Sequence, residues 1–138
     1  MTYYAVIDTN VLVSALLSGY ADAATVQLVG RMIGGEIVPI YSDEIMREYS
    51  AVLSRKKFKF EPDMVNYILS AIKKYGILVE PSDTDVILPD MKDLPFYGVV
   101  MEKRVDDAYL VTGNLKHFPV KPFIVTARQM LDIMDGKK

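Results

Sequence analysis

The order of apolar and polar positions along the chain predicts strands that alternate with helices. Short apolar runs, rich in β-branched and aromatic residues, predict strands at residues 3–7, 37–41, 77–79, 108–111 and 123–125. Apolar residues at helical spacing predict helices in the segments 26–33, 45–53, 65–72, 96–104 and 127–134, and the apolar segment 11–17 is a short buried helix or a turn. This alternation indicates an α/β fold with a mostly parallel sheet.

Polar residues mark where several of the predicted helices begin. Asp22, Ser42 and Asp93 each stand directly before a helical pattern. A side-chain oxygen at that place can accept a hydrogen bond from an unpaired backbone N–H group, so each is predicted to be an N-cap. Ser42 has Ile45 three residues later, where a capping box requires Glu or Gln, so no capping box is expected there.

Composition excludes several classes of protein and site. The chain has 138 residues, of which 51% are hydrophobic, and a net charge of −2, which favours one folded domain and excludes intrinsic disorder. It has no cysteine and a single histidine, His117, which excludes disulfide frameworks, thiol nucleophiles and multi-histidine metal sites. No signal peptide and no apolar run of bilayer length is evident, so we expect a cytoplasmic protein without a membrane partner.

Acidic and amide side chains follow the predicted strands. Asp8 comes directly after the first strand, and Asn114 follows the strand at 108–111. Glu44 and Glu48 lie one turn apart on the helix after the second strand. Because the carboxyl ends of parallel strands share one edge of the sheet, these side chains would converge there, and Asp93 can join them from the start of its helix.

The chemistry of this predicted cluster is that of a hard-cation site. Oxygen ligands without clustered histidine or cysteine are those that Mg²⁺ and Mn²⁺ prefer. A metal of this kind activates a water molecule and stabilises charge on a phosphoryl oxygen. The pattern therefore favours metal-dependent hydrolysis of a phosphodiester.

Five blocks of sequence carry a family resemblance. They are AVIDTNVLVSA at 5–15, SDEIMREY at 42–49, VLSRKKF at 52–58, DMKDLPF at 90–96 and YLVTGN at 109–114. In this order they resemble the PIN-domain ribonucleases, including the VapC-like toxins of toxin–antitoxin pairs, over nearly the whole chain. The resemblance implies a three-layer α/β/α, Rossmann-like PIN fold, a single nuclease domain over residues 1–138, and an endoribonuclease that depends on Mg²⁺ or Mn²⁺.

The same resemblance assigns roles to individual residues. Asp8, Glu48 and Asp93 match the family's first three metal-binding acids, and Glu44 is the alternative to Glu48. The fourth position is an aspartate in many relatives. Here it is Asn114, which is expected to assist catalysis because it keeps an oxygen ligand, although it lacks the charge.

Other polar residues near these acids have expected supporting roles. Asn10 and Thr112 are implied to orient Asp8 and the turn at Asn114. Asp90 is a candidate to compensate for the missing fourth carboxylate, and it is equally well explained as a solvated loop residue. Asp93 and Asn114 also have simple structural explanations, as a helix cap and as a turn former.

Two cationic features have weaker links to the predicted site. His117 is expected to be a surface histidine with a structural hydrogen bond. The basic residues Arg55, Lys56, Lys57 and Lys59 are either a solvated helix end or a contact for the RNA backbone.

The partners that follow from the resemblance are an RNA substrate, a cognate antitoxin and a second copy of the chain in a homodimer. The net charge of −2 does not exclude RNA, because a divalent cation would reverse the local sign at the acids. An alternative is a catalytically weak PIN-like module that binds RNA or protein, which Asn114 favours. A flap-type DNA nuclease or a phosphatase is disfavoured because a chain this short leaves little room for a DNA clamp.

Overall fold

A parallel sheet of five strands forms the centre of the computed structural model, which describes residues 2–137. The strand order is β3-β2-β1-β4-β5, and each neighbouring pair runs parallel. The strands are β1 (Tyr3–Ile7), β2 (Ile37–Tyr41), β3 (Ile77–Leu78), β4 (Tyr109–Val111) and β5 (Ile124–Val125). The carboxyl ends of all these strands therefore lie along one edge, with β1 in the middle.

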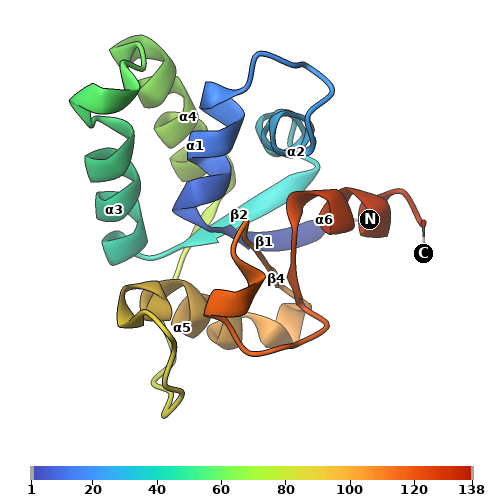
Figure 1. Cartoon of the computed structure of the whole chain (residues 1–138). Helices are drawn as coiled ribbons and strands as arrows, with labels where there is room; N and C mark the ends of the chain where they lie inside the picture. The colour runs from blue at the N-terminus through green and yellow to red at the C-terminus, as the bar shows by residue number, and fades with distance from the viewer. Residues whose placement is uncertain (1, 138) are drawn as a thin grey trace.

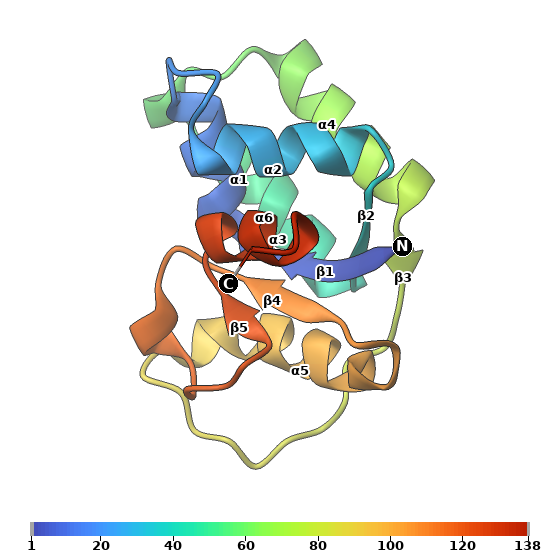
Figure 2. The same cartoon turned by 90° about the vertical axis from the view of Figure 1, so that its right-hand side faces the viewer.

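Helices cover both faces of this sheet. They are α1 (Thr9–Leu17), α2 (Ala24–Ile33), α3 (Asp43–Leu53), α4 (Pro62–Tyr75), α5 (Leu94–Glu102) and α6 (Ala127–Met134). Figures 1 and 2 show α1, α2 and α4 on one side of the sheet and α5 on the other. Short 3₁₀ turns lie between them: η1 (Lys56–Phe58), η2 (Met91–Asp93), η3 (Arg104–Asp106) and η4 (Leu115–His117). The predicted three-layer α/β/α arrangement is confirmed.

Apolar side chains on α3 attach that helix to the sheet. Ile45, Tyr49 and Leu53 are each at most 1% exposed and lie at helical spacing on one face. The Tyr49 hydroxyl donates a hydrogen bond to the backbone carbonyl of Ile7, the last residue of β1. The rings of Tyr49 and Phe96 lie 6.4 Å apart, which links α3 to α5. The polar face of α3 is therefore held over the carboxyl end of β1.

The predicted elements are largely confirmed, and the segment left open between helix and turn forms α1. The strands at 3–7 and 37–41 and the helix at 127–134 have the predicted bounds. The helix predicted to run to about residue 104 ends at Glu102 and continues as η3. Ser42 is an N-cap, since its Oγ accepts a hydrogen bond from the Ile45 N–H at 3.2 Å.

Two other predicted N-caps, Asp22 and Asp93, make no side-chain cap hydrogen bond, although Asp93 has the N-cap position of α5. The α2 helix begins one residue after Ala23, and Asp22 contributes only its backbone carbonyl, which accepts from Gln27 Nε2 at 3.0 Å. Asp93 occupies the position before α5, but its backbone is already helical because η2 leads directly into α5, and its side chain makes no cap hydrogen bond. The Asp90 side chain instead caps η2 by accepting from the Lys92 N–H at 3.0 Å.

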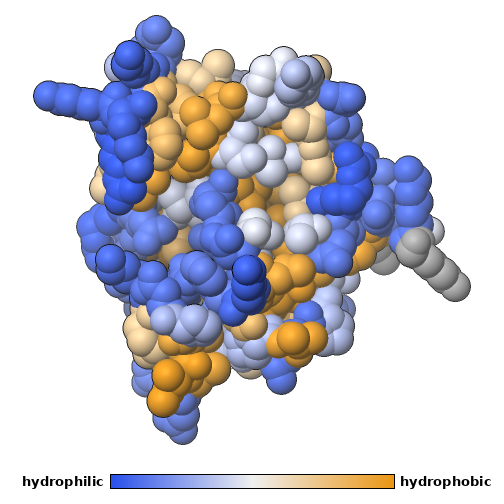
Figure 3. Space-filling model, viewed as in Figure 1, coloured by the Kyte–Doolittle hydropathy of each residue, from blue (hydrophilic) through white to orange (hydrophobic). Residues whose placement is uncertain are grey.

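Polar side chains cover most of the face seen in Figure 1, and apolar side chains reach the surface there in separate patches (Figure 3). Between residues 2 and 137, no helix combines the length and the hydropathy needed to cross a membrane.

Candidate active site at the carboxyl edge of the sheet

Asp8 lies at the carboxyl end of the central strand, and its side chain is held by two donors. The residue is only 5% exposed. Thr112 Oγ1 donates a hydrogen bond to Asp8 Oδ2 at 2.7 Å, and Asn10 Nδ2 donates to the same oxygen at 3.3 Å. The backbone N–H of Asp8 also donates to the Val111 carbonyl at 2.9 Å. Strand β4 and the turn that follows it therefore fix the position of the Asp8 carboxylate.

The turn after β4 is itself braced by these same polar residues. Thr112 is fully buried, and its Oγ1 accepts a hydrogen bond from the Asn114 N–H at 3.0 Å. The Gly113 N–H donates to Asn10 Oδ1 at 3.1 Å, and a Cβ at Gly113 would come within 3.4 Å of that oxygen. Asn10 and Thr112 thus make the contacts expected of residues that orient Asp8 and the turn. Asn114 is exposed and contributes its backbone to this bracing.

Glu48 reaches this edge from α3. Thr9, which is 5% exposed and adjacent to Asp8, donates a hydrogen bond from its hydroxyl to the Glu48 carboxylate. Glu44 lies one turn earlier on α3 and is exposed. The contact with Thr9 brings Glu48 rather than Glu44 beside Asp8, which favours Glu48 as the second acid.

Asp93 approaches from the opposite face of the sheet, at the end of η2. Its side chain is 18% exposed, and Asp93 Oδ2 lies 3.0 Å from His117 Nδ1. His117 stands on η4, three residues beyond Asn114, and its partner is 24 positions away in the sequence. The expectation of a hydrogen-bonded histidine agrees with this contact. Nothing in the local sequence around His117 identifies Asp93 as the partner.

The negative charges of Glu48 and Asp93 both act on Asp8. The pKa of Asp8 is raised from 3.8 to about 6, first because burial disfavours its charged form and then because Asp93 and Glu48 are negative, while the Thr112 hydrogen bond opposes the rise. Burial also raises the pKa of Asp93, and the His117 contact works against that increase. Burial first, and then the charges of Asp8 and Glu48, raise the pKa of the Tyr49 hydroxyl well above 10.

The donor chemistry of this edge fits a hard divalent cation. Asp8, Glu48 and Asp93 offer carboxylate oxygens whose mutual repulsion a cation would relieve. Within residues 2–137, however, no group of three Asp, Glu, His or Cys side chains is gathered closely enough to hold a metal ion. Mg²⁺ commonly uses one or two carboxylates and keeps several waters, so its binding does not require a closed group of three.

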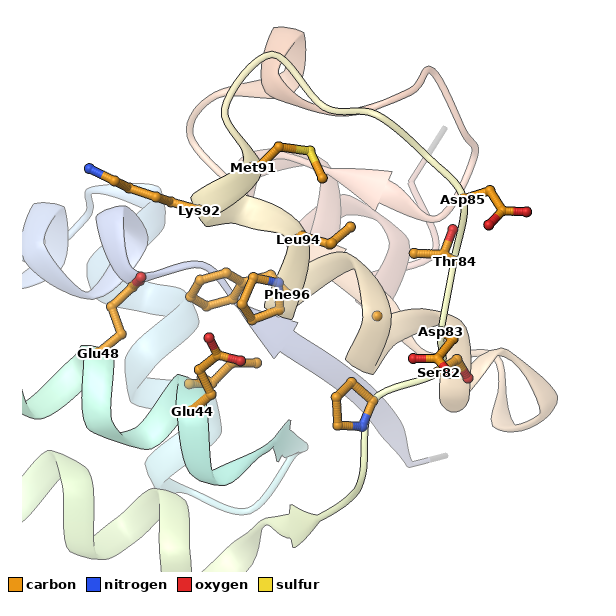
Figure 4. A pocket seen from close by; sticks show the side chains of 14 residues that line it. Glu44, Glu48, Ser82, Asp83, Thr84, Asp85, Met91, Lys92, Leu94 and Phe96 are labelled. Atoms are coloured by element: carbon orange, nitrogen blue, oxygen red, sulfur yellow. The ribbon is translucent and has the colours of Figure 1, made fainter.

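A cavity of about 870 Å³ opens beside Glu48. Figure 4 shows Glu44 and Glu48 projecting into it from α3, with Asp83 facing them from the opposite side and Asp85 pointing away. Phe96 and other apolar side chains from the start of α5 form part of its wall. The lining does not include Asp8 or Asp93, so the cavity adjoins the acidic site and is not the site itself.

Two further predicted candidates are Asp90, whose negative charge helps to raise the pKa of Asp93, and the basic run after α3. Asp90 caps η2 with its side chain, which agrees with its explanation as a loop residue. The basic residues follow the end of α3, beyond Leu53, at the other end of that helix from Glu44. There the rings of Phe58 and Phe60 are stacked with centroids 5.1 Å apart, and Lys57 Nζ lies 5.1 Å from the Phe58 ring.

Replacing Asp8 by Asn should stabilise the metal-free protein near neutral pH. An increase of the Asp8 pKa from 3.8 to about 6 corresponds to roughly 3 kcal/mol of unfavourable free energy once the group is ionised. Folding raises this pKa, so ionisation of Asp8 lowers the free energy of unfolding. The protein has its full stability below about pH 4, where Asp8 is protonated in both states, and loses about this amount as the pH rises through about 6. Asp8→Asn removes that loss and keeps an acceptor for Thr112.

We therefore expect urea unfolding in EDTA to show Asp8→Asn more stable than wild type by roughly 2–3 kcal/mol at pH 7.5, and nearly equal to it at pH 4. Asp63→Asn, an exposed acid on α4, serves as the control and should change little at either pH. A destabilised Asp8→Asn protein at pH 7.5 would contradict the electrostatic argument.

The sequence is similar to one known protein family over most of its length. The family model described as PIN domain matches residues 4–116, which include all of the candidate acids and Asn114. No curated protein and no solved structure matches the chain. Because the family match covers most of the sequence and the parallel sheet has the expected layers, the chain belongs to the PIN domain family.

Proposed function

We propose that this protein is a metal-dependent endoribonuclease that hydrolyses phosphodiester bonds in RNA. PIN domains are generally nucleases and generally use divalent metal ions. The observation that carries the proposal is the electrostatic coupling at the sheet edge, where buried Asp8 lies in the negative field of both Glu48 and Asp93. Such an arrangement is unfavourable in a protein that has no use for a cation there.

In the proposed mechanism Asp8, Glu48 and Asp93 hold Mg²⁺ or Mn²⁺. The bound cation would supply an activated water and neutralise charge on the phosphoryl oxygen. The protein's own groups orient the ligands: Thr112 and Asn10 hold one oxygen of Asp8, and Thr9 holds Glu48. Asn114 would assist as a neutral oxygen ligand or by holding a water at the turn.

The basic residues after α3 are proposed to contact the RNA backbone. Arg55, Lys56, Lys57 and Lys59 lie around the stacked pair of Phe58 and Phe60. Cations next to aromatic rings are the groups with which proteins bind single-stranded nucleic acids. Because this run follows the carboxyl end of α3, it would hold RNA to one side of the bond that is cut.

We further propose that the enzyme is the toxin of a toxin–antitoxin pair, active as a homodimer in the cytoplasm. This part of the proposal is supported by the resemblance of its sequence blocks to VapC-like toxins. A small DNA-binding protein encoded by the adjacent gene would support it, and the purification of both proteins as one complex would test it directly.

A catalytically weak PIN-like module that binds RNA or protein is the second candidate function. It is favoured by Asn114, which stands where many relatives have a fourth acid, and by the open spacing of the three carboxylates. The loss of one carboxylate lowers the affinity for a second cation. An enzyme with one metal ion and an inactive binding module would have the same fold, so a cleavage assay is needed to distinguish them.

RNA cleavage should require both a divalent cation and the three acids. With Mg²⁺ or Mn²⁺, wild type should cut single-stranded RNA, and Asp8→Asn or Asp93→Asn should lower the rate on the order of 100-fold or more, because the cation contributes several kcal/mol of charge stabilisation. Asp63→Asn is the matched control and should retain the wild-type rate. Parallel assays on single-stranded and flap DNA test the DNA-nuclease alternative.

Cleavage by wild type that persists in EDTA would overturn the metal-dependent mechanism. Saturable Mn²⁺ binding without any cleavage of RNA or DNA would favour the binding module.

The contact between Thr9 and Glu48 predicts unequal roles for the two glutamates of α3. Glu48→Gln should reduce the cleavage rate at least tenfold more than Glu44→Gln does, since only Glu48 is held beside Asp8. Both substitutions remove one charge from the same helix, so any general change in surface charge is matched. An equal or larger loss for Glu44→Gln would identify Glu44 as the ligand instead.

Metal-free protein should bind RNA poorly, because the sheet edge then presents three acids to a polyanion. We expect the Kd for a short single-stranded RNA to be about tenfold or more weaker in EDTA than in Ca²⁺, at constant ionic strength. Combining Lys56→Ala with Lys57→Ala should weaken binding in both buffers. The exposed pair Lys73 and Lys74 on α4 provides the matched double-alanine control. Equal affinity in the two buffers would contradict the prediction.

A further inference from the structure

The segment after β4 contacts two of the candidate acids, and these come from different elements. Thr112 Oγ1 donates to Asp8 Oδ2 at 2.7 Å, and His117 Nδ1 lies 3.0 Å from Asp93 Oδ2. Between these two contacts the backbone folds back on itself, because the His117 N–H donates to the Asn114 carbonyl at 3.0 Å. One short segment therefore bridges the ligand that follows β1 and the ligand that precedes α5.

We propose that His117 is a positioning residue that fixes the Asp93 carboxylate for divalent cation binding. The proposal rests on the proposed nuclease function and extends it to a residue outside the acidic set. His117 would donate its Nδ1 proton to Asp93 Oδ2, which would leave Oδ1 directed to the cation. This is the supporting role that hydrogen-bond partners of metal ligands commonly have.

The surroundings of Asp93 explain why an external partner is needed. The chain from Pro81 to Pro89 contains no helix or strand, and Asp93 follows it on the single turn η2. The Asp93 side chain does not cap α5, so local backbone contacts do not hold it. Among the described residues, His117 is the partner with which it forms a hydrogen bond.

His117 is well placed to supply that constraint because its own backbone is anchored. The next residue, Phe118, is 5% exposed, and its N–H donates to the Leu115 carbonyl at 3.1 Å. The imidazole itself is 41% exposed, so burial of the ring contributes little to the core. A histidine that is only partly buried but whose Nδ1 lies 3.0 Å from a candidate ligand is better explained by orientation than by packing.

The position of His117 also relates to the uncharged turn after β4. Asn114 supplies no carboxylate there. Three residues later His117 contributes a hydrogen-bond donor that acts on the third acid. The segment after β4 would thus support cation binding because His117 orients the Asp93 carboxylate, and it would add no carboxylate of its own.

Mn²⁺ affinity of the full chain, measured by calorimetry, tests this role separately from cleavage. His117→Phe keeps a ring but removes the donor, and it should weaken Mn²⁺ binding about 10–100-fold. His117→Asn places an amide N–H close to the position of Nδ1, and it should restore the Kd to within about threefold of wild type. Lys116→Ala, an exposed neighbour on the same turn, should bind as wild type does.

A merely structural histidine would give a different pattern. It would lower the Tm of the metal-free protein in His117→Phe but leave the Mn²⁺ Kd of the folded fraction unchanged. In cleavage assays, the positioning role predicts that rising Mn²⁺ concentration recovers most of the rate lost in His117→Phe. If His117→Phe does not fold, His117→Gln replaces it, since its amide N–H is displaced from the Nδ1 position and should not restore affinity.

The outcomes separate this inference from the function on which it rests. If wild type binds Mn²⁺ and loses that binding in Asp8→Asn, while His117→Phe binds as tightly as wild type, the inference is wrong and the nuclease proposal stands. If wild type itself shows no saturable Mn²⁺ binding, both are overturned. Weak binding by His117→Phe that His117→Asn does not restore would also overturn the positioning role.

Discussion

The hydrogen bond from Thr112 to Asp8 is the interaction on which this site depends. It joins the residue after β4 to the residue after β1, and it places a carboxylate at the centre of the sheet edge with only 5% of the residue exposed. A buried carboxylate is unfavourable unless hydrogen bonds or a cation compensate it. Burial raises the pKa of Asp8 although the Thr112 hydrogen bond opposes the rise, so the ionised carboxylate remains unfavourable at the candidate site.

Two further contacts extend that constraint to the other acids. The Tyr49 hydroxyl donates a hydrogen bond to the Ile7 carbonyl, next to Asp8, and so holds α3 against the end of β1. In this position of α3 the Thr9 hydroxyl donates to the Glu48 carboxylate. On the other face of the sheet, His117 holds Asp93 from the same segment that carries Thr112. All three acids thus contact residues that follow β1 or β4, which are neighbouring strands in the sheet.

Periodicity and topology predict most of this arrangement, but not its individual contacts. The strand at 3–7 and the parallel sheet place Asp8 correctly, because an apolar run followed by an acid indicates a strand end. The sequence places Asp93 directly before α5, where a side-chain cap is expected. Its carboxylate instead contacts His117, which is 24 positions away in the sequence, and it makes no cap hydrogen bond. The contact between Thr9 and Glu48, which lie 39 positions apart, is likewise not indicated by the local sequence.

The open spacing of the carboxylates and the high pKa of Asp8 have one physical explanation. Like charges at a shared edge repel, and Glu48 and Asp93 reach that edge from separate elements, α3 and η2. The proposed divalent cation would reverse the sign of this interaction. Because such a cation would bind the folded chain, it would add to stability once its concentration exceeds Kd. Its binding would then recover the free energy lost by burying Asp8, which would link the stability of this fold to the proposed chemistry.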